Sequence, residues 1–237
     1  MKKLASLLAF LCLATAASAQ SQPDSLKNRA FGSYIFIPVE FPIIDNKGFE
    51  NAVAAAGLPD AKQPPATLGI GFQFYANRGI STISFAKGTR RKEKDTYLTE
   101  MEYRSFSFNF GYDLTKSHRY ALYPYLGFKG NGLNYLYREK LDETTDLEDY
   151  LENDLQYKEI HNSRAHLDLG FGFARQSFYL INARVGYLVP LEKSRWTIND
   201  YLHLSAAPGT RYRFYFSLNI GFGAIFTEDD VRRRYSN

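Results

Sequence analysis

The strongest constraint on the fold is an alternation of side-chain type along residues 211 to 226, which read RYRFYFSLNIGFGAIF. Large apolar side chains hold one parity, at Tyr212, Phe214, Phe216, Leu218, Ile220, Phe222 and Phe226. Polar or small residues hold the other parity, at Arg211, Arg213, Ser217, Asn219, Gly221 and Gly223. Because successive side chains of a strand point to opposite faces, this period of two predicts a long β-strand between two unlike environments.

A hairpin with the same alternation is expected in residues 67 to 87, around the short turn ANRG. Pairing Ala76 with Gly79 places Phe72 opposite Ile83, so that the apolar side chains of both segments share one face. The two strand predictions therefore support each other.

Two further hairpins pass the same test. Residues 105 to 114 are expected to pair with residues 120 to 128 across the turn TKSHR, with Phe108 opposite Leu126. Residues 165 to 174 are expected to pair with residues 178 to 189 across the turn RQS.

A first strand near 31–38 and the last strand at 211–226 complete a set of eight. Short connections are expected at 76–79, 115–119 and 175–177, and long ones at about 39–66, 88–97, 139–160 and 190–210. Short turns at one end and long loops at the other, with an even number of antiparallel strands, indicate an all-β, up-and-down barrel.

The chain begins with a segment that is typical of a secretory signal peptide. Residues 1–19 contain Lys2 and Lys3, an apolar stretch and the small-residue pattern Ala17-Ser18-Ala19, and we expect cleavage after Ala19. The only cysteine, Cys12, lies in this segment, so the mature chain is expected to have neither a disulfide nor a thiol nucleophile. Loss of the two lysines lowers the formal net charge from +4 to +2, which does not indicate a nucleic-acid partner.

The environment of the apolar face separates three classes of β protein. A soluble lipocalin-like barrel has an apolar interior, a transmembrane barrel has an apolar exterior, and a soluble β-sandwich also uses such alternation in its core. Here the polar parity is rich in Gly, Ser, Thr, Asn and Gln, which suit a narrow lumen, and the 16% aromatic content suits a lipid-facing surface. The transmembrane barrel is favoured, with interfacial tyrosines expected at Tyr97, Tyr103, Tyr120, Tyr135, Tyr137, Tyr187 and Tyr212.

On these residues the chain resembles the small eight-stranded outer-membrane barrels of the OmpX type and the OmpA transmembrane-domain type. The resemblance implies periplasmic turns, extracellular long loops, localisation in the bacterial cell outer membrane and insertion by the outer-membrane assembly machinery. The expected organisation is a signal peptide at 1–19, a lead at 20–30, the barrel at 31–226 and a polar periplasmic tail at 227–237.

Two features depart from that pattern. The aromatic residue expected at the end of the last strand is Phe226, but the tail follows it, so the assembly signal must be read internally. Pro124 lies inside a predicted strand, where it removes one backbone donor, and we expect it to mark a bulge near the periplasmic rim.

The expected extracellular loops contain three notable segments. The acidic loop at 139–159, with a capping box from Thr145 to Glu148, either holds divalent cations that bridge lipopolysaccharide phosphates or is solvated and pairs with the basic segment at 87–94. The second interpretation is favoured because no Ca²⁺-loop spacing is present.

The first long loop contains an Ala-rich helix that starts near Phe49 and ends at Gly57. This helix either caps the barrel mouth, offers a partner surface or, as we favour, simply packs on the loop. In the fourth long loop, Trp196 and Tyr201 are expected at the outer membrane interface.

A polar network is expected inside the barrel. The third hairpin makes Asp168 and Arg184 direct cross-strand neighbours, and the same lumen is expected to contain Arg164, His166, Asn182 and Asn219. A structural ion-pair network is favoured over a catalytic group or a proton path, because small lumens are filled by side chains that need partners.

No catalytic, cofactor-binding or metal-binding residue is assigned. His118 lies in a short turn, His161 and His203 lie at or beyond the outer rim, and no Ser-His-Asp spacing, nucleophile elbow or paired metal histidines occurs.

The sequence therefore predicts a non-enzymatic outer-membrane barrel with an envelope-structural or surface-interaction role through its loops. Its expected partners are outer-membrane lipid, lipopolysaccharide, the assembly machinery and a protein at the cell surface. Three alternatives remain: a narrow channel, an accessory factor for secretion or surface assembly, and a lipid-modifying enzyme. A large pore is disfavoured because eight strands leave room only for side chains.

Overall fold

The computed structural model describes residues 30–59, 64–94, 97–115, 117, 119–139, 157–198, 202–203 and 209–227. The chain divides into two compact units, of which Phe31–Ile225 forms the barrel. The other unit, residues 1–30 and 226–237, is described only at Ala30, Phe226 and Thr227. The expected signal peptide and the capping box of the acidic loop lie outside the described residues.

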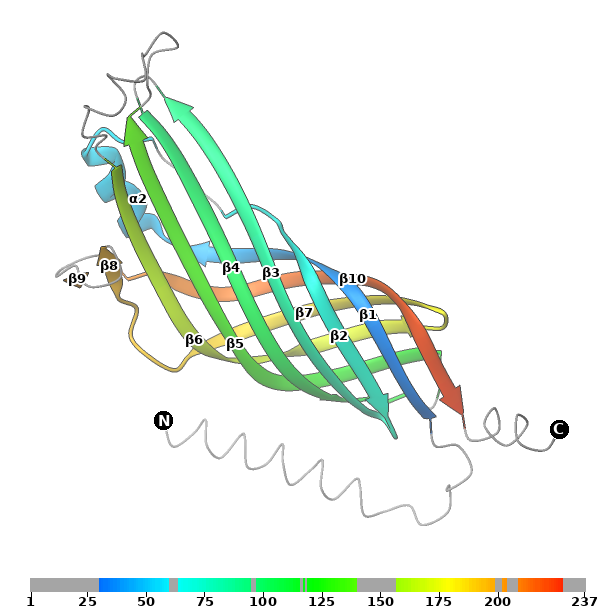
Figure 1. The fold of residues 1–237 in the computed structure, drawn as a ribbon. Helices are drawn as coiled ribbons and strands as arrows, with labels where there is room; N and C mark the ends of the chain where they lie inside the picture. The colour runs from blue at the N-terminus through cyan, green and yellow to red at the C-terminus, as the bar shows by residue number, and fades with distance from the viewer. Residues whose placement is uncertain are drawn as a thin grey trace, which may run out of the picture. The chain divides into compact units, whose positions relative to one another are not determined.

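Eight long antiparallel strands form a closed barrel, as the sequence predicts (Figure 1). The barrel strands follow the order β5-β4-β3-β2-β1-β10-β7-β6, and a pairing between β5 and β6 closes the ring. Two short strands lie outside the ring: β8 pairs with residues 160–162 near the start of β6, and β9 pairs with β8. The elements are β1 (Ala30–Asp45), α2 (Lys47–Ala55), β2 (Thr67–Ala76), β3 (Gly79–Lys94), β4 (Tyr97–Tyr112), β5 (Tyr120–Glu139), β6 (Tyr157–Gln176), β7 (Tyr179–Pro190), β8 (Trp196–Ile198), β9 (Leu202–His203) and β10 (Arg211–Thr227).

The register of the first hairpin is confirmed, with Phe72 opposite Ile83. The register of the second is wrong by two residues, because Phe108 lies opposite Phe128 rather than Leu126. The side chain of Asp113 accepts hydrogen bonds from the backbone N–H and the hydroxyl of Thr115, both at 2.9 Å, and so lengthens the turn.

The register of the third hairpin is wrong by four residues, since Asp168 lies opposite Leu188 and Arg184 lies opposite Gly172. The last paired residues are Gln176 and Leu180, so the turn lies two residues further along the chain than the sequence suggested. There the backbone N–H of Tyr179 donates to the Ser177 hydroxyl at 3.3 Å. A period of two cannot distinguish registers that differ by an even number of residues, so in both hairpins the turn decided the pairing.

The expected long loop at 88–97 is also wrong, because β3 continues to Lys94 and β4 begins at Tyr97. The basic segment at 87–94 is therefore part of β3. Polar residues occupy both faces of this stretch, which removes the alternation by which a strand is recognised. The first strand is likewise longer than expected and reaches Asp45.

Pro124 does not mark a bulge in the pair that β5 forms with β6. The register runs without interruption through Tyr123–Gly172, Pro124–Phe171 and Tyr125–Gly170. The ladder between β4 and β5 instead ends at Tyr125, so the missing donor of Pro124 falls just beyond it.

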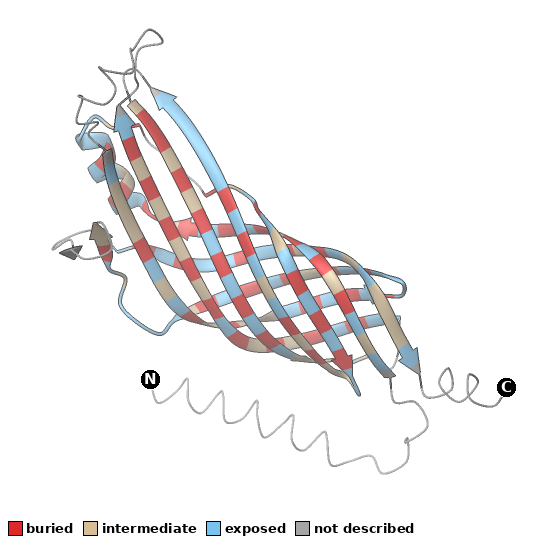
Figure 2. Cartoon of the chain, in the orientation of Figure 1, coloured by how far each residue is buried: buried red, intermediate tan, exposed pale blue. Residues whose placement is uncertain are grey.

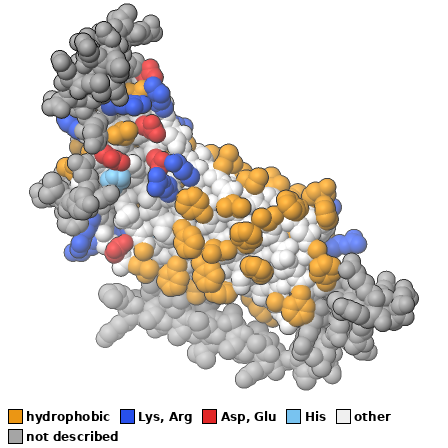
Figure 3. All heavy atoms as spheres, in the orientation of Figure 1, with side chains coloured by type: hydrophobic (Ala, Val, Ile, Leu, Met, Phe, Trp, Pro, Cys, Tyr) orange, Lys and Arg blue, Asp and Glu red, His pale blue; other side chains and the backbone are white. Residues whose placement is uncertain are grey.

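Exposed and buried residues alternate along the barrel strands (Figure 2). Figure 3 shows the exposed apolar side chains gathered over one part of the barrel, with most charged side chains toward the end that carries α2. The apolar belt is far larger than the apolar patches of soluble monomers, which supports a membrane-facing exterior. Its members include Ile37, Phe41, Ile70, Phe72, Phe74, Ile83, Phe85, Phe106, Phe108, Phe110, Leu122, Phe128, Phe171, Phe173, Ile181, Val185, Phe214, Phe216, Ile220 and Phe222.

The expected tyrosine girdle is only partly present. Tyr120 and Tyr187 are exposed, whereas the side chains of Tyr103, Tyr135, Tyr137 and Tyr212 are buried inside the barrel. In β10 the alternation breaks at Arg213 and Phe214, which are both exposed, so Tyr212 turns inward. Two consecutive exposed residues are typical of a β-bulge.

Candidate functional site

The barrel interior is filled by buried charged and polar side chains. Lys129 on β5 and Glu40 on β1 form an ion pair of 2.5 Å, and their side chains are only 1% and 5% exposed. The ammonium group of Lys129 also lies 3.9 Å from the ring centroid of Tyr215. A charge held this far from water needs such partners, so these three side chains form one buried group in the lumen.

A second buried group centres on Asp168. Its carboxylate lies 3.9 Å from the guanidinium of Arg184 and accepts a hydrogen bond of 2.7 Å from the hydroxyl of Tyr215. With its amide nitrogen toward Asp168, Asn109 donates to that carboxylate at 3.0 Å, and its oxygen accepts from Arg184. Arg184 thus reaches Asp168 diagonally along the inner face of the adjacent strands β6 and β7, although the two are not direct cross-strand neighbours.

The other predicted lumen residues lie around these groups. Asn182 receives a hydrogen bond of 2.8 Å from Tyr123, and its amide donates to Gln73 at 2.8 Å. Asn219 is buried and accepts from the hydroxyl of Ser217 at 2.7 Å.

His166 and Arg164 occupy different surroundings. His166 is fully buried and its Nδ1 lies 3.1 Å from the amide of Asn131. Arg164 is partly exposed and donates to the backbone carbonyls of Glu192 at 2.7 Å and Thr210 at 3.2 Å. Arg164 therefore ties the segment after β7 and the start of β10 to β6, apart from the Asp168 group.

The helix α2 joins an aromatic cluster in the outer part of the barrel. The ring of Phe49 stacks on Trp196 with centroids 4.2 Å apart, and it lies 4.8 Å from the ring of Tyr135. Asn46 fixes the start of the helix by donating to the Tyr135 hydroxyl and accepting from Thr210, each at 3.0 Å. Trp196 is 1% exposed, so its expected place at the membrane interface is wrong, and Tyr201 lies outside the described residues.

The outward face of β3 and β4 carries an ionic cluster beside the apolar belt. Glu102 lies 2.6 Å from the ammonium of Lys87 and also contacts the guanidinium of Arg104. Partial burial alone raises the pKa of Glu102, but the hydrogen bonds and positive charges of both partners outweigh it and lower the pKa below its usual value.

On the outward face of β6, three chemically active side chains follow one another at alternate positions. Nε2 of His161 lies 3.2 Å from a carboxylate oxygen of Glu159, and the exposed Ser163 is the next residue on that face. The same oxygen of Glu159 accepts from the amide of Asn134 at 2.9 Å. Unlike the buried His166, Glu159 and His161 are partly exposed and Ser163 is exposed on the outer surface of the barrel.

No group of three or more His, Cys, Asp or Glu side chains is placed to hold a metal ion within the part of the chain that the structure describes. No helix among the described residues is long and apolar enough to cross a membrane.

No protein-family model matches the chain, and no curated protein matches it. Among solved structures, 16 chains match. A major outer membrane protein from Thermus thermophilus is 10% identical, with a TM-score of 0.50 over 83% of this chain and 99% of that chain. The fold is that of a bacterial outer-membrane β-barrel.

Two further similar structures are also outer-membrane β-barrels. Ail, the attachment invasion locus protein of Yersinia pestis, was solved in complex with the heparin analogue sucrose octasulfate; it is 14% identical, with a TM-score of 0.43 over 85% of this chain and 100% of that chain. OprG from Pseudomonas aeruginosa is 15% identical, with a TM-score of 0.37 over 84% of this chain and 97% of that chain. With TM-scores below 0.5, these two likenesses carry no argument about this chain.

Sequence reasoning missed several residues that fill the lumen of this outer-membrane β-barrel. Glu40 lay beyond the expected end of the first strand, and Lys129 lay beyond the part of the fifth strand that was paired. The position of Lys129 was a usable signal, because it has the parity of the small lumen-facing residues and a cation there needs a buried partner. The buried tyrosines carried no such signal, since tyrosine is equally typical of an interface.

Proposed function

We propose that this protein is a closed, non-conducting and non-enzymatic outer-membrane barrel that presents its extracellular side for an envelope-structural or surface-interaction role. The observation that supports this proposal most directly is the filled lumen. The ion pair of Lys129 with Glu40 and the Asp168 group occupy the interior, and the aromatic cluster of α2 and Trp196 fills the outer part. A filled lumen does not conduct, so the function of such a barrel depends on what its outer surface binds.

The strands that continue beyond the apolar belt support the same role. The ladder between β3 and β4 runs without interruption from Gly79–Tyr112 to Lys94–Tyr97, well past the last belt residue of β3, Phe85. A paired ladder holds this charged extension in a fixed shape, which suits a surface that a partner recognises.

Single-channel recording in planar lipid bilayers tests the proposal. The purified, folded protein is expected to give no stepwise conductance, because buried charged and polar side chains occupy its lumen. A reproducible step of constant size, obtained with protein whose unheated form runs as a compact species on a gel, would favour the narrow channel instead.

A second function, hydrolysis of a lipid ester, is favoured by the row Glu159, His161 and Ser163. In that role Ser163 supplies the hydroxyl nucleophile, His161 accepts its proton and Glu159 orients the imidazole. The test is release of fatty acid from labelled lipopolysaccharide by the purified protein in mixed micelles. Release that is lost in Ser163→Ala and in His161→Ala, but kept in Ser33→Ala on β1, supports the enzyme; no release by the wild-type protein contradicts it.

A further inference from the structure

Four small residues form a block on the outward face of β5 and β6. One cross-strand row reads Phe85, Phe106, Gly130 and Ala165 from β3 to β6. The next row toward the extracellular side reads Lys87, Arg104, Gly132 and Ser163. Each row therefore passes from long side chains on β3 and β4 to small ones on β5 and β6.

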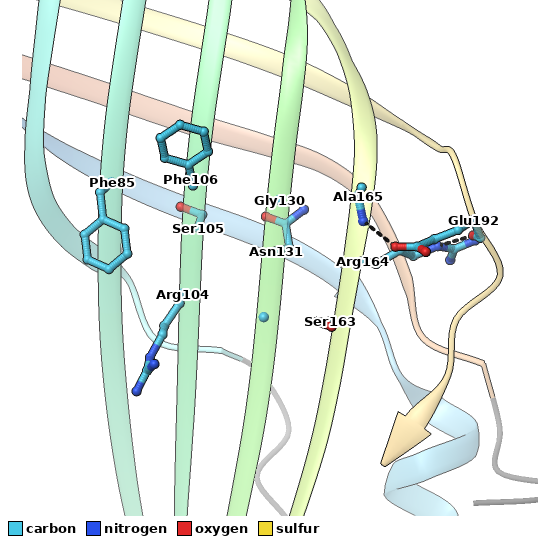
Figure 4. A pocket seen from close by; sticks show the side chains of 11 residues that line it. Phe85, Arg104, Ser105, Phe106, Gly130, Asn131, Ser163, Arg164, Ala165 and Glu192 are labelled. Carbon is cyan, nitrogen blue, oxygen red and sulfur yellow. Dashed lines mark hydrogen bonds between the residues drawn. The ribbon is translucent and has the colours of Figure 1, made fainter. Parts of the chain in front are cut away.

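This block is the floor of a surface recess of about 340 Å³. Its lining includes Phe85, Phe106 and Arg104 on one side and Glu192 on the other (Figure 4). A Cβ atom added to Gly130 or Gly132 would meet nothing within 4 Å, so the absence of side chains at these two positions keeps the recess open. The volume is about ten times the roughly 30 Å³ of one water molecule in the liquid, enough for a segment of hydrocarbon chain.

The recess lies where the apolar belt gives way to charge. Its lower row continues the belt, whereas the upper row carries Lys87 and Arg104, whose side chains are 46% and 59% exposed. Both cations contact the one carboxylate of Glu102, so the cluster has a net positive charge. An apolar floor beside an exposed basic group matches a ligand with a hydrocarbon chain and an anionic headgroup.

The opposite wall carries both charges, because the lining residues Glu192 and Arg164 lie next to each other there (Figure 4). A carboxylate oxygen of Glu192 accepts a hydrogen bond of 3.0 Å from the backbone N–H of Ala165, which holds that side chain at the edge of the recess. The carboxylate and the guanidinium of this wall offset each other, whereas Arg104 and Lys87 outnumber the single Glu102 on the other side. The net positive charge of the recess therefore lies on the side of β3 and β4.

We propose that this recess binds lipid A, the phosphorylated glycolipid of the outer leaflet. One acyl chain lies over Gly130 and Gly132, and a phosphate is held by Arg104 with Lys87. The proposal rests on the proposed function in one respect, namely that the barrel spans the outer membrane with the charged end of β3 and β4 outside. In that orientation the recess lies in the outer leaflet. Lipid A is chosen because it is the multiply acylated, phosphorylated lipid that surrounds the barrel wall in this leaflet.

Native mass spectrometry of the protein in detergent, titrated with lipid A, tests this site. The variant Gly130→Leu/Gly132→Leu fills the recess, and Arg104→Gln/Lys87→Gln removes the cations. Ser33→Leu on the belt and Arg213→Gln, which breaks the exposed pair with Asp45, are the matched controls. A compact unheated form on a gel shows that each variant is folded.

The wild-type protein and both controls are expected to retain one lipid A, and each recess variant to bind at least about tenfold more weakly. Dephosphorylated lipid A is expected to bind the wild-type protein about as weakly as lipid A binds the variant without the cations. Equal retention by the filled variant and by Ser33→Leu overturns the site. Equally tight binding of phosphatidylglycerol overturns the assignment to lipid A, and a dimer without lipid that Gly130→Leu/Gly132→Leu abolishes assigns the recess to a second copy. None of these outcomes depends on conductance, so the binding site and the closed lumen fail separately.

Discussion

At the scale of single residues, the barrel depends on charges that are removed from water and paired inside the lumen. Lys129 illustrates the principle, because it meets a carboxylate, an aromatic face and no solvent. The two ions of such a pair each lose hydration, so their attraction offsets a cost rather than adding a large net stabilisation. The pair is therefore most sensitive to the loss of one partner alone.

The variant Glu40→Gln leaves Lys129 charged and buried without a carboxylate, and we expect it to lower the free energy of unfolding by about 3–5 kcal/mol. The double variant Glu40→Gln/Lys129→Met removes both charges and should recover most of that loss. Urea unfolding of the protein in lipid vesicles, followed by tryptophan fluorescence, measures both. As a control, Arg213→Gln breaks an exposed ion pair and should change the value by less than about 1 kcal/mol. A double variant no more stable than Glu40→Gln would contradict this account of the pair.

The ionic cluster on the outer face makes stability depend on acid pH through Glu102. Its pKa in the folded protein lies below the ordinary value of 4.5, because Lys87 and Arg104 outweigh the effect of burial. The cluster therefore stabilises the fold fully at pH values above the ordinary pKa of the carboxyl group. This contribution is lost as the pH falls through the lower pKa that Glu102 has in the folded state. Because both cations are largely exposed, the effect is expected to be small.

Unfolding midpoints in urea measured between pH 3 and pH 7 test this sign. Glu102→Gln should reduce the difference between the wild-type midpoints at the two ends of the range, and it should lower stability at pH 7 more than at pH 3. An unchanged pH profile in this variant would show that Glu102 carries none of the dependence.

At the scale of elements, α2 and β8 act together on the outer part of the barrel. Neither is part of the closed ring, yet they meet through the stacked rings of Phe49 and Trp196. The helix is nine residues long, which is too short to be stable by itself in water, so its position depends on these contacts. The helix α2 is thus the part of the barrel expected to loosen first when one ring is removed.

Phe49→Ala is expected to cost about 3–5 kcal/mol locally and to release the helix α2 from Trp196. Since Trp196 is the only tryptophan, its fluorescence reports the change directly. We expect a red-shifted emission and faster quenching by acrylamide, with the barrel still compact on an unheated gel. The control Ala54→Ser changes an exposed position of the same helix and should leave the spectrum as in the wild-type protein. A wild-type spectrum in Phe49→Ala would show that the helix does not cover the tryptophan.

The elements also show how far the sequence can predict this fold. Alternation identified the eight long strands and the faces that β2, β6 and most of β10 turn outward, because one face meets lipid and the other a polar lumen. It failed for the β3 extension, where both faces are polar, and for two registers, where only the chemistry of a turn selects among even shifts. The outer recess was equally hidden, since the small residues of β5 and β6 align with each other and with the long side chains of β3 and β4 only when every register is correct.

At the scale of the whole molecule, the barrel is asymmetric along its axis. One end has turns at 77–78 and 177–178 between paired strands, and the other has the charged ladder of β3 and β4, the helix α2 and the strand β8. The apolar belt lies nearer the end with short turns. This asymmetry supports an orientation with the short turns in the periplasm, and both the surface role and the lipid site depend on it.

Cysteine labelling on intact cells tests this orientation. The only cysteine of the sequence, Cys12, lies in the expected signal peptide, so a single introduced cysteine becomes the only thiol of the mature barrel. Arg91→Cys, on the extended part of β3, is expected to react with a membrane-impermeant maleimide on intact cells. Arg119→Cys, in the turn before β5, should react only after the outer membrane is permeabilised. Both positions are exposed in the structure, so accessibility in the folded protein does not separate them. The reverse pattern would place the charged end in the periplasm and remove the basis for lipid A binding, whereas labelling of both positions on intact cells would contradict a membrane-spanning barrel.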